Sequence, residues 1–345
     1  MPRSRAWAGG EAGLALVAGR SSSGGLEAML ARGLRRAGYR VAALGYEDFC
    51  GRPGLAGGVA LRRLLVSPLR ERLLAASPCL RAYNRAVARA VERLGPDLVL
   101  VVKGEALSRA TLRLLRRHGA PCLAYLNPDE PRYMSLTLLY REEGFTLFTP
   151  CRPCLLFLRR RGARVFFLPF AADIDPAAEW PGCGVRLRAV ALLGTMYPAR
   201  LRAVRRLLRG GVPVVVAGPG WRLLVPGAGH GLYGRRYVAA IRAAYASLNV
   251  HHPSDRGYKA NMRVFEIPGA GGVELTDNPG EVLAFYTRGE VYTYRGTGEL
   301  LEAAREILEE PRENLCEKAR RAYEKTRRLH TYSHRARYVA SACSL

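Results

Sequence analysis

The sequence lacks an apolar run long enough to cross a membrane. A membrane-spanning helix needs about 18 or more apolar residues in succession, whereas pieces such as "DLVLVV" and "VPVVVAG" have only the length of strands. The N-terminus carries early arginines, but Glu11 and Arg20 bracket an apolar stretch too short for a signal peptide. We therefore expect a cytoplasmic protein.

Acidic residues and lysines are scarce. The 345 residues include 29 Asp+Glu against 54 Lys+Arg, a formal net charge of +25. Only four of the basic residues are lysines, so arginine carries nearly all the positive charge. Such a surface attracts nucleic acid, acidic membranes and phosphorylated small molecules. The same excess fits a thermophile-like composition, and charge alone does not choose between these explanations.

A second CxxC pair is also missing. Cys151 and Cys154 form a single CxxC, and the other cysteines of the eight are scattered. Structural zinc sites take four ligands, commonly from two such pairs. The sequence therefore predicts no metal site, while a disulfide within this pair stays open for a hyperthermophilic source.

What the sequence does contain is a regular alternation of strand-like and helix-like segments. The opening, "GLALVAG" followed by "LEAMLARGLRRAGYRV" and "VAALGY", is a βαβ unit of the Rossmann kind without a GxGxxG fingerprint. A second such series starts at "AVALLGT". This length suits two domains of roughly 150 residues. We predict an α/β fold of GT-B architecture: two Rossmann-like domains facing across a cleft, with a C-terminal helix that crosses back to the first.

The domain limits follow from the breaks in this pattern. The Pro- and Gly-rich segment "IDPAAEWPGCGVRLR" interrupts the periodicity and indicates a linker. We predict an N-terminal Rossmann-like domain over residues 1–172, a linker over 173–188, a C-terminal Rossmann-like domain over 189–325, and a C-terminal helix and tail over 326–345.

Several segments in order resemble the CgeB-like family of spore maturation proteins, which are GT-B glycosyltransferases with a glycosyltransferase family 1-like C-terminal domain. The matching pieces are "PDLVLVVKGEAL", "LNPDEP", "RVFFLPFAAD", "VALLGTMYPARLRAV", "VVVAGPGW", "AAIRAAYASLNVHHPSD", "NMRVFEIPGAGGVELTDNPGE" and "HTYSHRA". The resemblance implies a nucleotide-sugar donor bound by the C-terminal domain and an acceptor approached from the N-terminal domain. It implies no tightly bound cofactor, with a UDP-, GDP- or dTDP-sugar as co-substrate.

The resemblance places Glu266 where such enzymes bind the ribose of the donor. A carboxylate suits a vicinal diol because its two oxygens can accept two O–H groups at once. A capping or ion-pairing role for Glu266 is the alternative. Gly269 and Gly271 would let backbone N–H groups approach the diphosphate at a helix start. The other positions implied for donor binding are Gly194, Thr195, Arg200, Asn249, Asn261, Arg263 and Thr276, with Lys259 as a further cation.

The chain departs from the retaining GT-B pattern, which has a second glutamate eight positions before the first. Tyr258 stands at that position, which puts retaining chemistry in doubt. An inverting enzyme needs a general base for the acceptor hydroxyl. Asp129 and Glu130, on a Pro-bounded loop, are the candidate catalytic carboxylates, although loop carboxylates commonly only form turns.

These observations predict a hexosyltransferase-type enzyme that is metal-independent and acts on an unidentified glycan, lipid-linked or protein acceptor. The basic surface leaves open a peripheral contact with anionic membrane. Two alternatives are an inactive nucleotide- or glycan-binding module, motivated by Tyr258, and a nucleic-acid-binding protein, motivated by the charge. No helix-turn-helix, RNA-recognition or zinc-finger signature supports the latter.

Overall fold

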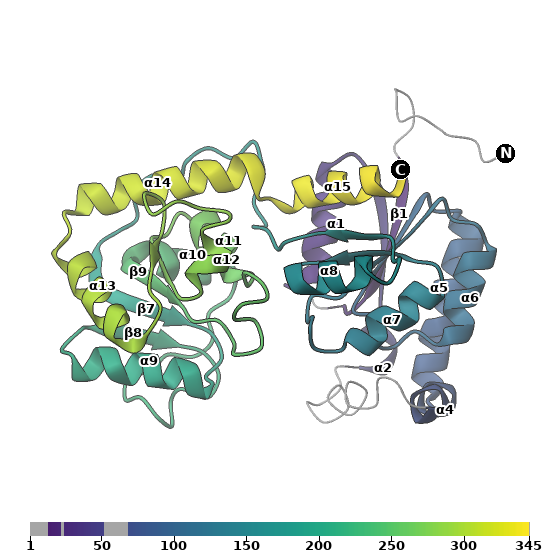
Figure 1. The fold of residues 1–345 in the computed structure, drawn as a ribbon, viewed down its shortest axis with the longest axis horizontal. Coiled ribbons are helices and arrows are strands. Elements are labelled where there is room, and N and C mark those ends of the chain that lie inside the picture. The colour runs from purple at the N-terminus through teal and green to yellow at the C-terminus, as the bar shows by residue number, and fades with distance from the viewer. Residues whose placement is uncertain (1–12, 22–23, 52–67, 345) are drawn as a thin grey trace. The chain divides into compact units, whose positions relative to one another are not determined.

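The computed structural model describes residues 13–21, 24–51 and 68–344. The chain divides into two compact units, of which the first comprises Met1–Pro169 with Tyr332–Leu345 and the second Phe170–Thr331 (Figure 1). The N-terminal segment and the basic region around residues 52–67 lie outside the described residues. Each unit has its own hydrophobic core.

The first unit is built around parallel strands. Its elements are β1 (Leu14–Gly19), α1 (Leu26–Arg36), β2 (Arg40–Gly45), α2 (Glu47–Cys50), α4 (Pro68–Ala76), α5 (Pro78–Leu94), β3 (Leu98–Val102), α6 (Arg109–Arg117), β4 (Cys122–Leu126), α7 (Met134–Glu142), β5 (Thr146–Thr149), α8 (Arg152–Arg159), β6 (Val165–Phe167) and α15 (Tyr332–Ser344). The strands pair in the order β2-β1-β3-β4-β5-β6. Strand β3 is buried at every position, as expected for a sheet covered on both faces.

Local sequence signals explain where the helices of this unit begin. Ser108, predicted as an N-cap, accepts a hydrogen bond from Thr111 N at 3.2 Å at the start of α6. Ser77 caps α5, whose first residue is Pro78. These caps satisfy N–H groups that the helices leave without intrahelical partners.

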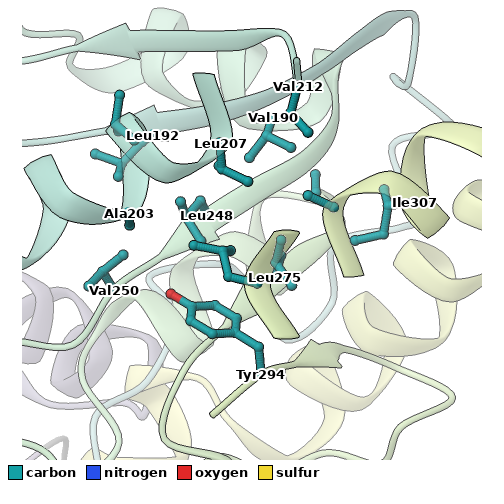
Figure 2. Packing of buried hydrophobic residues seen from close by; sticks show 14 of the residues in the cluster. Val190, Leu192, Ala203, Leu207, Val212, Leu248, Val250, Leu275, Tyr294 and Ile307 are labelled. Atoms are coloured by element: carbon teal, nitrogen blue, oxygen red, sulfur yellow. The ribbon is translucent and has the colours of Figure 1, made fainter. Parts of the chain in front are cut away.

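The second unit repeats the same plan. Its elements are β7 (Leu187–Leu193), α9 (Pro198–Arg209), β8 (Val214–Ala217), α10 (Gly234–Ala243), β9 (Ala244–Asn249), α11 (Arg263–Gly269), β10 (Glu274–Thr276), α12 (Pro279–Val282), β11 (Tyr292–Thr293), α13 (Thr297–Glu309) and α14 (Arg312–Leu329). The strands pair in parallel in the order β11-β10-β9-β7-β8. Apolar side chains from these strands and from α9 and α13 form the core, including Val190, Leu192, Leu207, Leu248, Leu275 and Ile307 (Figure 2). The predicted α/β class is confirmed.

Both sheets share one topology. Read in chain order within each unit, the strands of both follow the sequence 2-1-3-4-5, and the first unit adds a sixth strand. The order reverses between β1 and β3 in the first unit and between β7 and β9 in the second. In open parallel sheets, ligands bind beyond the carboxyl ends of the strands at such a reversal.

The last helix completes the first unit. Helix α15 contacts α1 and β4, and a disulfide joins Cys343 in α15 to Cys122 in β4. The prediction that the C-terminal helix crosses back to the N-terminal domain is therefore confirmed.

Residues 173–188, predicted as a linker, cluster with the second unit. Trp180 packs against Tyr323 of α14 with ring centroids 5.3 Å apart, and Arg242 Nη2 donates to Pro181 O at 2.7 Å. A disulfide joins Cys183 to Cys316. The Pro- and Gly-rich composition that breaks periodicity thus forms an irregular but packed segment.

All eight cysteines are paired in disulfides. The remaining two pairs are Cys50–Cys79 and Cys151–Cys154, both in the first unit. Disulfides persist in oxidising compartments and, inside cells, in hyperthermophiles. Across the described residues, no helix combines the length and apolar character required of a membrane span.

Candidate functional site

Polar side chains gather at the strand-order reversal of the second unit. Gly194 follows β7, and its φ of 136° is one that L-residues rarely adopt. Its N–H donates to Ala217 O at 2.7 Å, and its carbonyl accepts from Trp221 Nε1 at 2.6 Å. A Cβ on Gly194 would lie 2.1 Å from Nη2 of Arg263. Glycine is therefore needed here so that this guanidinium can lie against the backbone.

Two arginines converge on this glycine. Arg200 lies in the first turns of α9, and Arg263 begins α11. Arg200 is 6% exposed, donates from Nη1 to Thr195 O at 2.8 Å, and lies over the Tyr197 ring at 4.4 Å. Its Nε is buried without a hydrogen-bond partner. The Thr195 carbonyl thus holds the guanidinium of Arg200 in place.

The positive charge of this pair is offset only from a distance, because Glu266 attracts Arg263 without reaching ion-pair distance. Within the described part of the chain, no carboxylate lies within ion-pair distance of Arg200 or Arg263. Burial, followed by repulsion from Arg263, lowers the pKa of Arg200 to about 10. Placing the half-buried Arg263 against the buried Arg200 without an ion-paired carboxylate is costly. An anion bound between them would relieve that cost.

Glu266 lies one turn along α11 from Arg263. It is partly buried, and Tyr237 Oη of α10 donates to its Oε2 at 3.5 Å. Burial raises the pKa of Glu266, whereas Arg263 and Tyr237 act in the opposite direction. The site therefore combines a cationic pair with one carboxylate that can accept hydrogen bonds. This combination suits a ligand that carries both phosphate and hydroxyl groups.

The two predicted asparagines bind each other. Asn249 Nδ2 donates to Asn261 Oδ1 at 3.0 Å, and Asn261 Nδ2 donates to Asn249 Oδ1 at 2.9 Å. Asn249 Nδ2 also donates to Glu274 Oε1 at 3.0 Å, and Asn261 Oδ1 accepts from Val264 N at 3.3 Å at the start of α11. Their amides therefore position α11 and Arg263.

A buried histidine extends this support. His251 is fully buried; its Nδ1 lies 2.6 Å from Asp277 Oδ1, and its Nε2 accepts from Asn261 N at 3.1 Å. Arg256 donates to the other oxygen of Asp277 at 2.6 Å. Thr276, buried at the end of β10, donates to the Asp277 carbonyl at 3.2 Å. Since Thr276 is fully buried and uses its hydroxyl there, it supports the loop.

The predicted glycines lie at the wrong end of their helix for the role expected of them. Helix α11 ends at Gly269, so Gly269 and Gly271 do not present N–H groups at a helix start. A Cβ on Gly269 would lie 2.5 Å from the Ala172 Cβ, and one on Gly271 would lie 3.1 Å from the Trp180 ring. These glycines permit close packing against residues 172–180. Lys259 is also buried, with its Nζ 3.3 Å from Asp255 Oδ1.

The first unit carries a different constellation at its own strand-order reversal. Lys103 follows β3 with φ 63°, a strained backbone for a lysine. Tyr125 and Tyr140 hold this turn, because their hydroxyls donate to the carbonyls of Lys103 and Gly104, each at 3.0 Å. Lys103 Nζ lies 3.2 Å from Asp129 Oδ2. The strained turn thus places a cation against one predicted catalytic carboxylate, whose side chain is 37% exposed.

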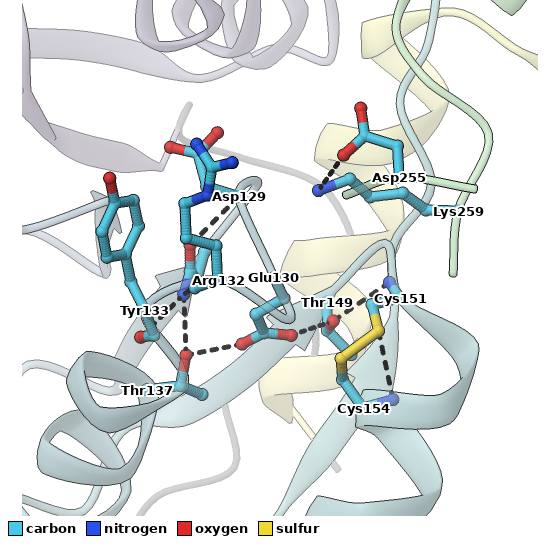
Figure 3. The surroundings of a disulfide bond; sticks show 11 residues. Asp129, Glu130, Arg132, Tyr133, Thr137, Thr149, Cys151, Cys154, Asp255 and Lys259 are labelled. Carbon is cyan, nitrogen blue, oxygen red and sulfur yellow. Dashed lines mark hydrogen bonds and ion pairs between the residues drawn. A yellow bond between two sulfur atoms is a disulfide. The ribbon is translucent and has the colours of Figure 1, made fainter. Parts of the chain in front are cut away.

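The neighbouring Glu130 is in a different environment. It is completely buried, and its two oxygens accept hydrogen bonds from the hydroxyls of Thr137 and Thr149 (Figure 3). Thr149 Oγ1 also accepts from Cys151 N at 3.1 Å. Because an acceptor hydroxyl cannot reach a fully buried carboxylate, Glu130 is structural in this conformation. Of the two predicted carboxylates, Asp129 alone has the exposure that proton transfer requires.

Sequence reasoning missed Tyr197, Tyr237 and Glu274. The tyrosines flank the arginine pair, and Glu274 is a fully buried carboxylate behind it. Tyr237 and Glu274 lie inside apolar segments, where a polar atom is read as part of a core face, whereas Tyr197 lies in the loop just before α9. Over the described residues, no group of three or more His, Cys, Asp or Glu side chains is placed to hold a metal ion.

Comparison with solved structures defines the fold class. The chain is similar to the sucrose-phosphate synthase of Thermosynechococcus elongatus, with a TM-score of 0.62 and 13% identity over 96% of this chain and 98% of that one. It is equally similar to the UDP-forming α,α-trehalose-phosphate synthase of Burkholderia vietnamiensis, with a TM-score of 0.62 and 12% identity over 97% and 100% of the two chains. T4 phage BGT, solved with its UDP-glucose substrate, gives a TM-score of 0.54 and 11% identity over 96% and 99%. The fold is that of the GT-B glycosyltransferases.

The sequence itself matches one family model. Residues 199–341 match the family described as "Glycosyl transferase-like". The match begins beside Arg200 and contains Arg263 and Glu266. No curated protein matches the chain.

Proposed function

We propose that this protein transfers a sugar from a nucleotide-sugar donor to a hydroxyl of an acceptor. The observation that carries the proposal is the pair of the buried Arg200 and the half-buried Arg263 against Gly194, with Glu266 one turn away. The GT-B fold and the match over residues 199–341 support the same reading. The finer resemblance to the CgeB-like branch is part of the proposal.

The second unit holds the donor in this proposal. Arg200 and Arg263 bind the diphosphate and stabilise the negative charge that develops on the departing nucleoside diphosphate. They thereby take the electrostatic role that a metal ion has in other transferases. Glu266 accepts hydrogen bonds from the ribose hydroxyls. The Thr195 carbonyl holds the Arg200 guanidinium in position, which limits the reorganisation needed as the bond to the sugar breaks.

The first unit supplies the acceptor side. Asp129 takes the proton of the acceptor hydroxyl as that oxygen attacks the anomeric carbon, which is inverting chemistry. Lys103 favours the ionised form of Asp129, the form that a base requires. Tyr258, where retaining enzymes have a glutamate, is consistent with this choice.

A thermal-shift screen tests donor binding. UDP, GDP, dTDP and their sugars are added to the wild type and to Arg263→Gln and Glu266→Gln variants. A ligand at about 100 times its Kd stabilises the native state by about 2.7 kcal/mol, and we expect each variant to lose most of that shift. Arg202→Gln is the matched control, because Arg202 lies on the exposed side of the same helix as Arg200. If no nucleotide raises the wild-type Tm, or if Arg263→Gln retains the full shift, the proposed site is wrong.

The alternative of an inactive binding module is motivated by Tyr258, which is 39% exposed and carries no carboxylate. It predicts the same nucleotide-induced shift with neither donor hydrolysis nor transfer. Chromatographic detection of released nucleoside diphosphate, across a panel of glycan and lipid-linked acceptors, separates the two. Release that depends on both an acceptor and Asp129 supports the enzyme.

A further inference from the structure

One stretch of the second unit contains no acidic residue. Residues 180–254 include no Asp or Glu and eleven arginines. A stretch of this length without a carboxylate produces a strong local positive potential that nothing within it offsets. It includes α9, β8 and α10 and the long connection between β8 and α10.

That connection, between β8 and α10, is a closed loop. Its two ends pair, since Gly218 N donates to Gly229 O at 3.2 Å and Gly229 N donates to Val216 O at 2.8 Å. Trp221 is fully buried and donates to Gly194 O, which anchors the start of the loop. The N–H groups of Leu224 and Val225 donate back to Trp221 O. The loop is therefore compact and is anchored at Trp221.

Large apolar side chains of this connection and of α10 face solvent. Leu223 is 92% exposed, and Tyr233, just before α10, is 77% exposed. Leu224 and Val238 are each 39% exposed. Arg222, Arg235 and Arg236 are exposed among them. An exposed leucine beside a rigid anchor, with an exposed tyrosine and arginines close to it in the sequence, is the composition of segments that enter the lipid interface.

We propose that the segment Arg222–Val238 docks on an anionic membrane surface. The arginines attract the lipid headgroups, while Leu223 and Tyr233 enter the boundary between headgroups and acyl chains. A nucleic acid would use the same arginines, and the anisotropy titrations with duplex DNA below distinguish it from a membrane. This surface goes beyond the proposed transfer reaction and is tested without any donor or acceptor.

Vesicle flotation is the test. The full chain is mixed with phosphatidylcholine vesicles, or with vesicles that also contain phosphatidylglycerol, at low and at high salt. We expect flotation with the anionic vesicles only, and weaker flotation at high salt. The variant Leu223→Ser/Tyr233→Ser should lower the partition coefficient by about tenfold or more. Arg222→Gln/Arg235→Gln/Arg236→Gln should lower it by a similar factor.

Matched controls come from the first unit. Leu156→Ser removes a leucine that is 56% exposed on α8, and Arg85→Gln/Arg89→Gln/Arg93→Gln removes three exposed charges from α5. Neither should change partitioning by more than about twofold, the scale of a general charge effect. Because all substituted side chains are exposed, unchanged Tm values verify folding.

Three results would overturn the proposal. One is a wild type that stays in solution with anionic vesicles at low salt. Another is a Leu223→Ser/Tyr233→Ser variant that floats as the wild type does, while the arginine variant loses affinity for vesicles and for duplex DNA by the same factor. Flotation measures the first affinity and anisotropy titration the second. The third is a loss of nucleotide-induced stabilisation in the leucine–tyrosine variant with flotation intact, which would assign the loop to the donor instead.

Discussion

The two units use one topology for opposite electrostatic purposes. At the strand-order reversal of the second unit, Arg200 and Arg263 lie together without a carboxylate in ion-pair distance among the described residues. At that of the first unit, charges are paired: Lys103 with Asp129 at 3.2 Å, and Arg20 with Glu47 at 2.5 Å. The same edge of the same kind of sheet is thus an unsatisfied cation pair in one unit and a neutralised network in the other.

This difference teaches where an anion can bind. Paired charges gain little from an added phosphate, because their partner would have to be displaced. The buried Arg200 and its half-buried neighbour Arg263 gain more from a phosphate, because no ion-paired carboxylate has to be displaced. The fold provides the position at the ends of the strands, but the residues after β3 and β7 decide what binds there.

Replacement of Asp129 should have the largest effect. If the first unit provides the base, Asp129→Asn lowers kcat by about 10²–10⁴-fold, the range of general base catalysis, and leaves donor binding unchanged. Steady-state kinetics and nucleotide titration of the same preparation measure both. Glu130→Gln is the contrast, since that buried carboxylate accepts from two threonines: it should lower Tm more than kcat. An Asp129→Asn enzyme of normal kcat would remove the base from the first unit.

Removal of single disulfides should affect the stability of the two units differently. Three of the four lie in the first unit, and Cys122–Cys343 spans a sequence separation of 221 residues. Cys122→Ser/Cys343→Ser should destabilise that unit by about 2–5 kcal/mol and leave nucleotide binding by the second unit intact. Calorimetry with and without nucleotide detects this, and Cys183→Ser/Cys316→Ser is the reciprocal control. If either double variant lowered the stability of both units equally, the two units would not unfold independently.

The third largest effect should come from Gly194→Ala, which we expect to lower nucleotide affinity at the arginine pair. Gly194→Ala adds an atom where Arg263 Nη2 lies and strains a backbone with φ 136°. We expect a loss of about 1–3 kcal/mol in stability together with weaker nucleotide binding, measured by calorimetric titration. Gly298→Ala, in open space on α13, is the control. Unchanged affinity in Gly194→Ala would mean that Arg263 is free to act from elsewhere.

The smallest effect concerns pH and Glu274. Burial raises the pKa of Glu274 to about 8 from 4.5, and its Oε2 has no hydrogen-bond partner. The folded state therefore holds a proton that the unfolded state releases, so the free energy of unfolding falls as pH rises from about 4.5 to about 8. Glu274→Gln, neutral throughout, should match the wild type near pH 4 and exceed its Tm by a few degrees, about 2–4 °C per kcal/mol, near pH 8.

The exposed Glu302→Gln is the control for this prediction, because its surroundings leave the carboxylate in water. Melting curves across this pH range should show no crossover for it. A Glu274→Gln variant less stable than the wild type at pH 8 would mean that Asn249 needs the charged carboxylate.

The motif in the sequence identified residues of the site correctly, but the local conformation of that motif was predicted wrongly. Arg263 and Glu266 were found from one motif, and both lie at the cation site. Gly269 and Gly271, from the same motif, were assigned to a helix start that is in fact a helix end. The start lies at Asn261, which accepts from Val264 N and is itself held by His251 just after β9. The run "YVAAIRAAYASLN" divides into α10 and β9 without an intervening loop. Periodicity alone does not show such a junction.

By itself, the sequence determined the α/β class and the two-domain plan, because hydrophobic periodicity and chain length are local or additive properties. Only the tertiary structure decided which charges are paired. Arg200 and Arg263 are 63 positions apart in the sequence (263 − 200) and meet over Gly194, whereas Lys103 meets Asp129. The energy of a charge depends on burial and on neighbours a few ångströms away, and those distances are set by the pairing of strands.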